Sequence, residues 1–290
     1  MPDTSLRPRR SVLYMPSSNE RALEKAKSIA CDALILDLED AVAPDAKEAA
    51  RANAVAAAKS DEYGHREITI RCNGLDTPWG ADDIAAAATS GADAVVIPKV
   101  GSHAYLEEVE RHLDAAGAPA HMTIWAMIET PTALLDIRSI ANHGRVNVLV
   151  MGTNDLIKEL RTAMLPDRSP LIPHLATALV GAREADKVIL DGVYNDVRDP
   201  DGFLVEAEQG KALGFDGKTL VHPSQVAPTN TVWAPGDDEV DFSRRVIEAF
   251  EQAEAEGRGV ITVDGKMIEN LHVDNARRVL AVADAIAALG

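Results

Sequence analysis

Two apolar runs decide the fold of this chain: TIWAMI at residues 123–128 and VNVLVM at residues 146–151. An acidic residue follows each run within four positions, Glu129 after the first and Asp155 after the second. Such runs are typical of buried parallel strands, and a residue just past the last apolar position lies at the carboxyl end of the sheet, where α/β folds bind ligands. The two carboxylates therefore either converge on one hard cation or mark two helix starts, because both sites also resemble N-caps.

The same alternation of apolar runs and Ala-rich amphipathic segments continues from the start of the chain to about residue 222. Strands are expected at 11–15, 33–38, 68–72, 94–98, 123–128, 146–151, 187–190 and 217–221. Helices are expected at 19–30, 45–59, 82–90, 103–115, 131–143, 170–185 and 204–213. Eight such units without a Gly-x-Gly-x-x-Gly after the first strand favour a (β/α)8 TIM barrel over a dinucleotide-binding sheet.

The pattern changes after residue 225. A Glu-rich helix is expected at 237–256, a strand at 260–263 before an Asp264-Gly265 turn, and a last helix at 275–289. We predict a barrel catalytic domain at residues 1–225 and a mainly helical C-terminal appendage at 226–290. Because this segment is short and highly charged, we do not expect it to hold a hydrophobic core of its own. We expect the appendage to pack on the barrel or on a neighbouring subunit.

Composition excludes several classes of partner. The formal net charge of −17 argues against a nucleic acid or an anionic membrane surface. Only Cys31 and Cys72 are present, without metal-ligand spacing, and both are expected to be buried, inert thiols in a reducing compartment. No stretch reaches the roughly 18 apolar residues of a membrane span, so the sequence predicts a cytoplasmic protein with no membrane or nucleic-acid partner.

Polar residues follow nearly every expected strand, which strengthens the cation hypothesis. They are Asp37, Glu39 and Asp40 after the second, Arg71 and Asn73 at the end of the third, Lys99 after the fourth, Glu129 and Asp155 after the fifth and sixth, and Asp191 and His222 after the last two. Mg²⁺ prefers oxygen ligands and often takes only one or two protein carboxylates, a role that Glu129 and Asp155 suit. Zinc is disfavoured because no His–Cys cluster has the required spacing.

Arg71 is the candidate for binding a substrate carboxylate, since its guanidinium offers a bidentate fork. The alternative is a structural ion pair with the acidic group Asp37, Glu39 and Asp40. We expect that group to orient Arg71 and metal-bound water rather than to hold the metal directly. Glu39 is therefore also a candidate catalytic residue.

Several motifs, in order along the chain, resemble the citrate lyase β-subunit and malyl-CoA lyase (HpcH/HpaI aldolase) family. They are residues 11–17, LDLEDAVAP at 36–44, RCNG at 71–74, IET at 128–130, GTNDL at 152–156, GFDGK at 214–218 and HPSQ at 222–225. The resemblance implies a barrel that assembles as a homotrimer or homohexamer, a CoA-thioester substrate, and Mg²⁺ with Mn²⁺ as a substitute.

The resemblance also assigns residues. Glu129 and Asp155 fall on the metal-ligand positions, with Glu129 also at the substrate, and Arg71 falls on the substrate-carboxylate and thioester position. Tyr14, Asn19 and Lys25 fall where the family contacts CoA. Asn19 replaces a more basic residue, and Lys25 has the alternative role of a solvated helix charge.

The implied reaction is cleavage of a β-hydroxyacyl-CoA, such as malyl-CoA or citramalyl-CoA, to a 2-oxo acid and acetyl-CoA or a homologue. In the family an Asp donated across the subunit interface acts as the base, whereas this chain has Glu269 there. The stretches ENLH at 269–272, YGHR at 63–66 and DGVYN at 191–195 resemble the branch of (3S)-malyl-CoA thioesterases, which release malate and CoA. We therefore place a lyase first, with a thioesterase, a citrate lyase β-type subunit of a larger complex, and a CoA-independent barrel aldolase as alternatives.

Overall fold

The computed structural model describes residues 7–255 and 261–289, which belong to two compact units. The first unit is Arg9–Val232, and the second contains the described residues beyond Val232. The first unit thus includes nearly all of helix α10 (Val226–Trp233), which the sequence assigned to the appendage by placing the boundary at residue 225. No helix of the described residues is long and apolar enough to cross a membrane.

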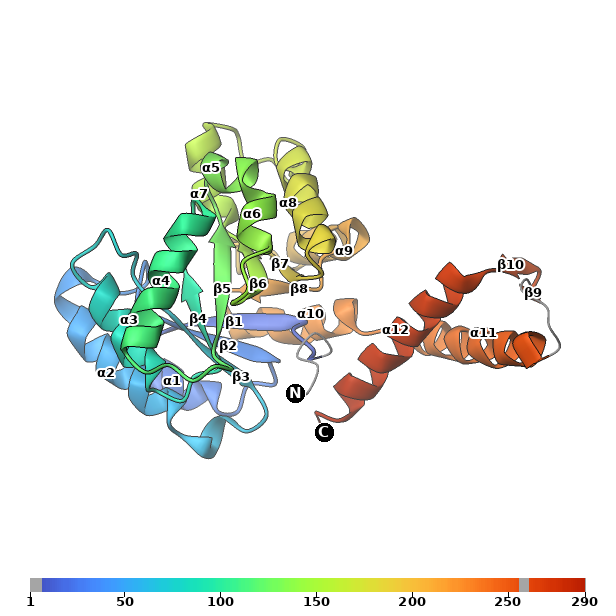
Figure 1. Cartoon of the computed structure of the whole chain (residues 1–290), viewed down its shortest axis with the longest axis horizontal. Helices are drawn as coiled ribbons and strands as arrows, with labels where there is room; N and C mark the ends of the chain where they lie inside the picture. Colours follow the sequence, from blue (N-terminus) through green and yellow to red (C-terminus); the bar gives the residue numbers. More distant parts are fainter. Residues whose placement is uncertain (1–6, 256–260, 290) are drawn as a thin grey trace. The chain divides into compact units, whose positions relative to one another are not determined.

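Eight parallel strands close into a barrel in chain order, with β8 hydrogen-bonded to β1 (Figure 1). They are β1 (Ser11–Pro16), β2 (Ala33–Asp37), β3 (Glu67–Arg71), β4 (Ala94–Ile97), β5 (Thr123–Ile128), β6 (Val146–Met151), β7 (Val188–Asp191) and β8 (Gly217–Leu220). The predicted barrel is confirmed, and the strand bounds agree because buried parallel strands read as continuous apolar runs.

Helices follow the strands around the barrel (Figure 1). They are α1 (Glu20–Ala26), α2 (Lys47–Ala58), α3 (Gly80–Ala88), α4 (His103–Ala115), α5 (Pro131–Leu135), α6 (Ile137–Ala141), α7 (Thr153–Leu160), α8 (Ile172–Glu184) and α9 (Pro200–Leu213). Short 3₁₀ turns are η2 (Pro44–Ala46), η3 (Asp61–Tyr63) and η4 (Pro223–Gln225). The single helix expected at 131–143 is instead two, because Asp136 (φ −108°, ψ 17°) leaves the helical conformation.

Alternate residues of the strands fill the barrel interior. The buried interior cluster is Val12, Ala33, Ile35, Ala94, Val96, Trp125, Met127, Val148, Val150 and Leu190. At the amino end, Arg9 and Glu67 form a buried ion pair of 2.6 Å, and the Arg9 guanidinium lies 5.5 Å from the centre of the Trp125 ring. The period-two alternation then places the next inward residue of β2, β3 and β5 at the carboxyl end of the barrel.

The C-terminal unit consists of α11 (Asp237–Ala255), a hairpin of β9 (Ile261–Val263) and β10 (Lys266–Ile268), and α12 (Asn270–Ala287) (Figure 1). The predicted Asp264-Gly265 turn joins the two strands, with both residues at positive φ. The unit has its own core, formed by Val246, Phe250, Ala253, Ile261, Val263, Ile268, Val273 and Ala276. The expectation that this segment cannot hold a core is therefore wrong, because two long helices and the hairpin enclose these side chains together.

Candidate active site at the carboxyl end of the barrel

Four side chains extend the inward-facing rows past the barrel core. Tyr14 follows Val12 on β1, and Asp37 follows Ile35 on β2. Arg71 ends β3, and Glu129 comes two residues after the interior residue Met127 of β5. Because each belongs to the face that lines the barrel, all four converge at its carboxyl end, where the sequence predicts the site.

Arg71 is held by the acidic residues of the β2 end. Its Nε and Nη2 each donate to one carboxylate oxygen of Asp37 at 2.7 Å, and its Nη1 lies 2.9 Å from Glu39 Oε2. The guanidinium also stacks over the Tyr14 ring, 4.8 Å from its centre. Burial alone would lower the pKa of Arg71, but the Asp37 charge and hydrogen bonds raise it above its usual value.

This geometry corrects one expectation about Arg71. The bidentate edge that the sequence assigns to a substrate carboxylate is occupied by Asp37, as the alternative of an ion pair with the acidic group proposed. Nη1 is not bonded to Asp37; it contacts Glu39 at 2.9 Å and lies 4.0 Å from the Met127 sulfur. The Asp37 oxygens also accept from the backbone N–H groups of Glu39 (2.9 Å) and Ala41 (3.2 Å), so one buried carboxylate organises both the loop and the arginine.

Glu39 and Asp40 differ in their environment. Glu39 is buried between Arg71 and Lys99, whose Nζ lies 3.2 Å from Glu39 Oε1, and burial raises the Glu39 pKa. Asp40 is exposed, with its carboxylate 3.8 Å from Arg71 Nη1. From below the loop, the buried Lys47 donates to the backbone oxygens of Leu38 and Glu39, both at 2.7 Å. The loop that carries these acids is therefore fixed on both sides.

Glu129 is 2% exposed, and its Oε1 accepts from the backbone N–H of Lys99 at 2.6 Å. Lys99 adopts φ +50°, an uncommon conformation for a residue with a side chain. A Cβ at position 152 would lie 2.3 Å from Glu129 Oε2, so only glycine fits beside this carboxylate. Burial raises the Glu129 pKa to about 7, and the charges of Glu39 and Asp155 add to the increase.

Asp155 lies in the first turn of α7 and lines the same cavity as Glu129, so its charge adds to the raised pKa of Glu129. Both acids stand at helix starts, as the alternative interpretation expected, but neither is itself the capping residue. Thr130 caps α5, with its Oγ1 accepting from Ala133 N at 3.1 Å, and Gly152 precedes α7.

A cation fits this arrangement. In the described part of the chain, no lysine or arginine side chain forms an ion pair with the buried Glu129 carboxylate, and a second carboxylate is close by. Among residues 7–255 and 261–289 no three His, Cys, Asp or Glu side chains form a ready metal cluster. A cation here would therefore take two protein carboxylates and complete its coordination with water or substrate, as Mg²⁺ does.

A cavity of about 310 Å³ opens beside these residues. It is lined by Tyr14, Asp37, Asp40, Ala41, Arg71, Met127, Glu129, Met151, Gly152, Thr153, Asn154, Asp155, Val193, Asn195 and Val221. Charged groups come mainly from β2, β3 and β5, while Val193 and Val221 add apolar surface after β7 and β8. Glu39 does not belong to the lining, so it acts on the cavity through Arg71.

Asn73 and Asp191 form buried structural contacts and do not line the cavity, although the sequence suggested that strand-end residues would. Asn73 bonds Lys47 and Asp83 instead, with its Nδ2 2.6 Å from Asp83 Oδ2. Asp191 is fully buried against Arg168 and Lys218, at 2.8 and 3.3 Å. Successive residues of a strand point to opposite faces. Because Leu190 faces the barrel interior, the next residue, Asp191, points outward.

The remaining predicted residues lie outside the cavity lining. Asn19 Oδ1 caps α1 by accepting from Ala22 N at 3.1 Å, and Lys25 is exposed on the same helix. His222 is exposed, with its Nδ1 2.8 Å from Ser224 Oγ. Glu269 is exposed in the C-terminal unit, where its backbone N donates to His272 Nδ1 at 3.0 Å. The CoA contacts of Asn19 and Lys25 and the catalytic role of Glu269 stay predictions.

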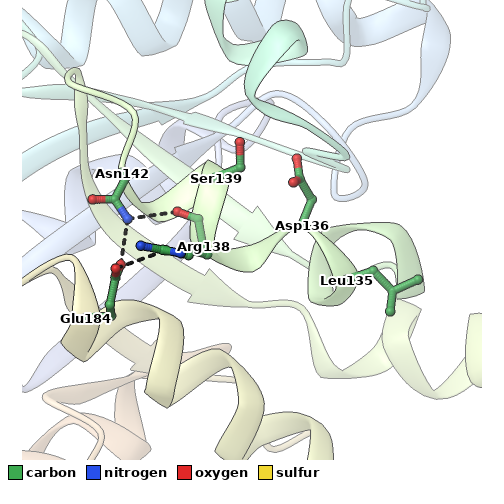
Figure 2. Close-up of a pocket in the computed structure, with 6 residues that line it drawn as sticks. All are labelled: Leu135, Asp136, Arg138, Ser139, Asn142 and Glu184. Atoms are coloured by element: carbon green, nitrogen blue, oxygen red, sulfur yellow. Dashed lines mark hydrogen bonds and ion pairs between the residues drawn. The ribbon is translucent and has the colours of Figure 1, made fainter.

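A second hollow, of about 420 Å³, lies on the barrel surface at α5, α6 and α8 (Figure 2). Its lining residues are Leu135, Asp136, Arg138, Ser139, Asn142 and Glu184. Glu184 accepts from Arg138 Nε at 3.0 Å and from Asn142 Nδ2 at 2.7 Å. All three side chains are solvated, and the Asn142 hydrogen bond lowers the Glu184 pKa, so the Glu184 charge is already compensated by its neighbours.

A closed eight-stranded barrel with an arginine and buried carboxylates at its carboxyl end defines the class of TIM-barrel enzymes. Residues 10–223 match the HpcH/HpaI aldolase/citrate lyase family, and the chain belongs to that family. The predicted family resemblance is confirmed.

Three relatives indicate the range of the family. The chain is 50% identical over 281 residues to the (3S)-malyl-CoA thioesterase of Cereibacter sphaeroides (strain ATCC 17029 / ATH 2.4.9), covering 97% of this chain and 96% of the relative. It is 36% identical over 284 residues to citrate lyase subunit beta of Escherichia coli (strain K12), covering 96% and 94%. The crystal structure of CitE from Mycobacterium tuberculosis in complex with magnesium, acetoacetate and coenzyme A is 27% identical with a TM-score of 0.77, covering 94% and 97%.

Proposed function

We propose that this chain is a Mg²⁺-dependent enzyme that hydrolyses a malyl-CoA-type thioester to malate and free CoA. The similarity to a (3S)-malyl-CoA thioesterase over nearly the whole chain carries the proposal. It moves hydrolysis ahead of the carbon–carbon cleavage that the sequence alone placed first.

Glu129 and Asp155 are the proposed metal-binding residues, with Mn²⁺ as an alternative occupant. The buried Glu129 carboxylate, whose pKa is about 7, is destabilised without a cation. The magnesium in the CitE complex supports the choice of metal. When bound, Mg²⁺ supplies a Lewis acid that polarises oxygens of the acyl group.

Arg71 is proposed to stabilise the charge that develops on the thioester oxygen, by donating from Nη1. Asp37 fixes the guanidinium plane through two hydrogen bonds, and Tyr14 supports it from one face. Burial raises the pKa of Tyr14 above its usual value, so the phenol stays protonated at neutral pH. Glu39 is proposed as a positioning residue, because it contacts Arg71 and Lys99.

In the proposed reaction a water oxygen attacks the thioester carbonyl carbon, the C–S bond breaks, and the water proton is transferred to the CoA sulfur. Arg71 is proposed to face the carbonyl oxygen, and Val193 and Val221 contribute apolar surface to the cavity.

Carbon–carbon cleavage to glyoxylate and acetyl-CoA is the second candidate. It is favoured by the 36% identity to a citrate lyase subunit and by the acetoacetate and coenzyme A in the CitE complex. For this reaction Glu269 is the proposed base. A homotrimer or homohexamer, packing of the C-terminal unit on the barrel or on a neighbouring subunit, and a cytoplasmic location complete the proposal.

Product analysis tests the proposal directly. The purified chain is incubated with malyl-CoA and Mg²⁺, with an EDTA-treated sample as control, and the products are separated by chromatography. Malate with free CoA is the expected result. Glyoxylate with acetyl-CoA would establish the lyase instead, and the absence of either pair would contradict both. Turnover by the isolated chain would also exclude dependence on an acyl carrier partner.

A further inference from the structure

Two asparagines form a reciprocal amide pair at the cavity. Asn195 Nδ2 donates to Asn154 Oδ1 at 2.8 Å, and Asn154 Nδ2 donates to Asn195 Oδ1 at 3.3 Å. Both residues line the cavity, one from the segment after β6 and the other from the segment after β7. Each carboxamide keeps one N–H and part of its acceptor capacity for a ligand.

The position of the pair assigns it to the acyl end of the cavity. Asn154 directly precedes Asp155, one of the proposed metal-binding residues. In a closed barrel of eight strands, β7 lies four strands from β3, so Asn195 stands across the barrel from Arg71. The CoA contacts predicted for Tyr14, Asn19 and Lys25 belong to β1 and α1.

The segment that carries Asn195 is fixed in place. A Cβ at Gly192 would lie 2.4 Å from Thr153 Oγ1, so the segments after β6 and β7 touch through a position that only glycine fits. The fully buried Lys218 donates to the Gly192 backbone oxygen, and Gln225 Nε2 donates to the Tyr194 backbone oxygen at 2.9 Å. The two amides themselves are exposed to solvent, while these buried contacts fix the backbone segments that carry them.

We propose that the Asn154–Asn195 pair is a specificity-determining wall of the acyl pocket. It acts as one unit and sets the size of the acyl group that the cavity accepts. This inference rests on the proposed function. Malyl and citramalyl groups differ by one methyl, and a rigid wall discriminates a methyl by roughly 10- to 200-fold. Truncating either amide removes the bridge and opens space beside Val193.

The test compares, for each protein, two kcat/KM values measured on the same sample, one for each thioester. For wild type, Asn154→Ala, Asn195→Ala and the double variant, kcat/KM is measured with malyl-CoA and with citramalyl-CoA. The fraction of folded protein cancels in the ratio, so a purely structural defect leaves it unchanged. We expect each single variant to shift the ratio about tenfold toward citramalyl-CoA. Since the pair acts as one unit, the double variant should shift it no further.

Asn142→Ala is the matched control. This asparagine also makes two hydrogen bonds, but it lines the surface hollow of Figure 2 and not the carboxyl-end cavity. Its ratio should equal that of wild type. Asn195→Ser, which keeps a polar group, should give a smaller shift in the same direction.

Ratios within twofold of wild type in all pair variants would overturn the proposal, as would single shifts that add fully in the double variant. A wild-type chain that turns over neither thioester removes the proposed function and this inference with it. Turnover of malyl-CoA with an unchanged ratio removes the inference alone.

Discussion

The barrel has two hollows with similar residue types and opposite electrostatics. In the carboxyl-end cavity, Glu129 is buried and pairs with no lysine or arginine among the described residues, and burial raises its pKa to about 7. In the surface hollow of Figure 2, Glu184 is 42% exposed in its side chain, bonded to Arg138 and Asn142, and its pKa is lowered. The carboxylate of Glu129 is thus desolvated, whereas that of Glu184 is solvated and held by two hydrogen bonds.

The difference shows how to recognise a site in this barrel. A solvated acid with a hydrogen-bonded partner is already stable and gains little from a ligand. A desolvated acid next to another acid gains from any cation that replaces its lost hydration. In this barrel the burial of the carboxylate therefore distinguishes the cavity from the surface hollow.

The largest effect is expected from Glu129→Gln. The amide keeps the size and can still accept from Lys99 N, but it loses the charge that holds the metal. Mg²⁺-dependent turnover should fall at least about a thousandfold, or about 4 kcal/mol. Glu184→Gln is the matched control and should stay within twofold of wild type in the same assay. Retained activity in Glu129→Gln would remove this residue from the metal.

The second prediction concerns stability without metal. Because the Glu129 pKa is raised from about 4.5 to about 7 on folding, the folded state binds the extra proton in this interval. The free energy of unfolding should therefore fall as pH rises from 4.5 to 7, by about 3 kcal/mol from this group.

Urea unfolding in EDTA at pH 5 and pH 8 measures the effect. Glu129→Gln should be more stable than wild type at pH 8 and nearly equal at pH 5. Glu184→Gln should show the opposite sign, because the pKa of Glu184 is lowered by folding. Equal stabilities of Glu129→Gln and wild type at both pH values would contradict the contrast between the two hollows.

Arg71→Lys should have the third-largest effect. A lysine cannot bond both Asp37 oxygens and also direct a fixed N–H toward the cavity. We expect kcat/KM to fall at least about thirtyfold, or roughly 2 kcal/mol. Arg138→Lys makes the same change in the surface hollow and should leave kcat/KM unaltered. Near-normal turnover of Arg71→Lys would show that the pre-formed guanidinium plane is not needed.

The smallest effect is expected from Glu269→Asp. This variant tests whether a carboxylate of the C-terminal unit influences which reaction occurs. Shortening this carboxylate by one methylene restores the residue that the family pattern has, at a position where about 1 Å matters. A few-fold gain of glyoxylate and acetyl-CoA over malate and CoA is the expected result. An unchanged product ratio would argue that Glu269 takes no part in choosing the reaction.

The barrel could be predicted from sequence because its strands are continuous apolar runs with polar residues at one end. No bound of the predicted strands differs from the structure by more than one residue. The break at Asp136 could not be predicted, since nothing in 131–143 interrupts the helical pattern. The C-terminal core was missed because it depends on pairing between α11 and α12, which are amphipathic and highly charged when considered singly.

The site was predictable as far as the position of each residue along its strand. Glu129 and Arg71 follow strand residues that face the barrel interior, so they reach the cavity. Asp191 follows an inward-facing residue directly and therefore points outward, to Arg168. Three-dimensional contacts could not be predicted. They include the Lys99 N–H that reaches Glu129 from a strained backbone and the Asp37 carboxylate that occupies the Arg71 edge. The partnership of Asn154 with Asn195, residues 41 positions apart, likewise has no local signal.

The buried residues Arg9, Glu67 and Trp125 have a consequence for the route by which substrate and products enter and leave the enzyme. In the part of the chain that the structure describes, these buried side chains fill the amino end of the barrel, and the cavity lies at the carboxyl end. Under the proposed function, the thioester, water and both products would pass through the carboxyl-end opening of the cavity. A bound CoA carrier would then stand between the acyl group and the bulk, and the malate behind it would leave last.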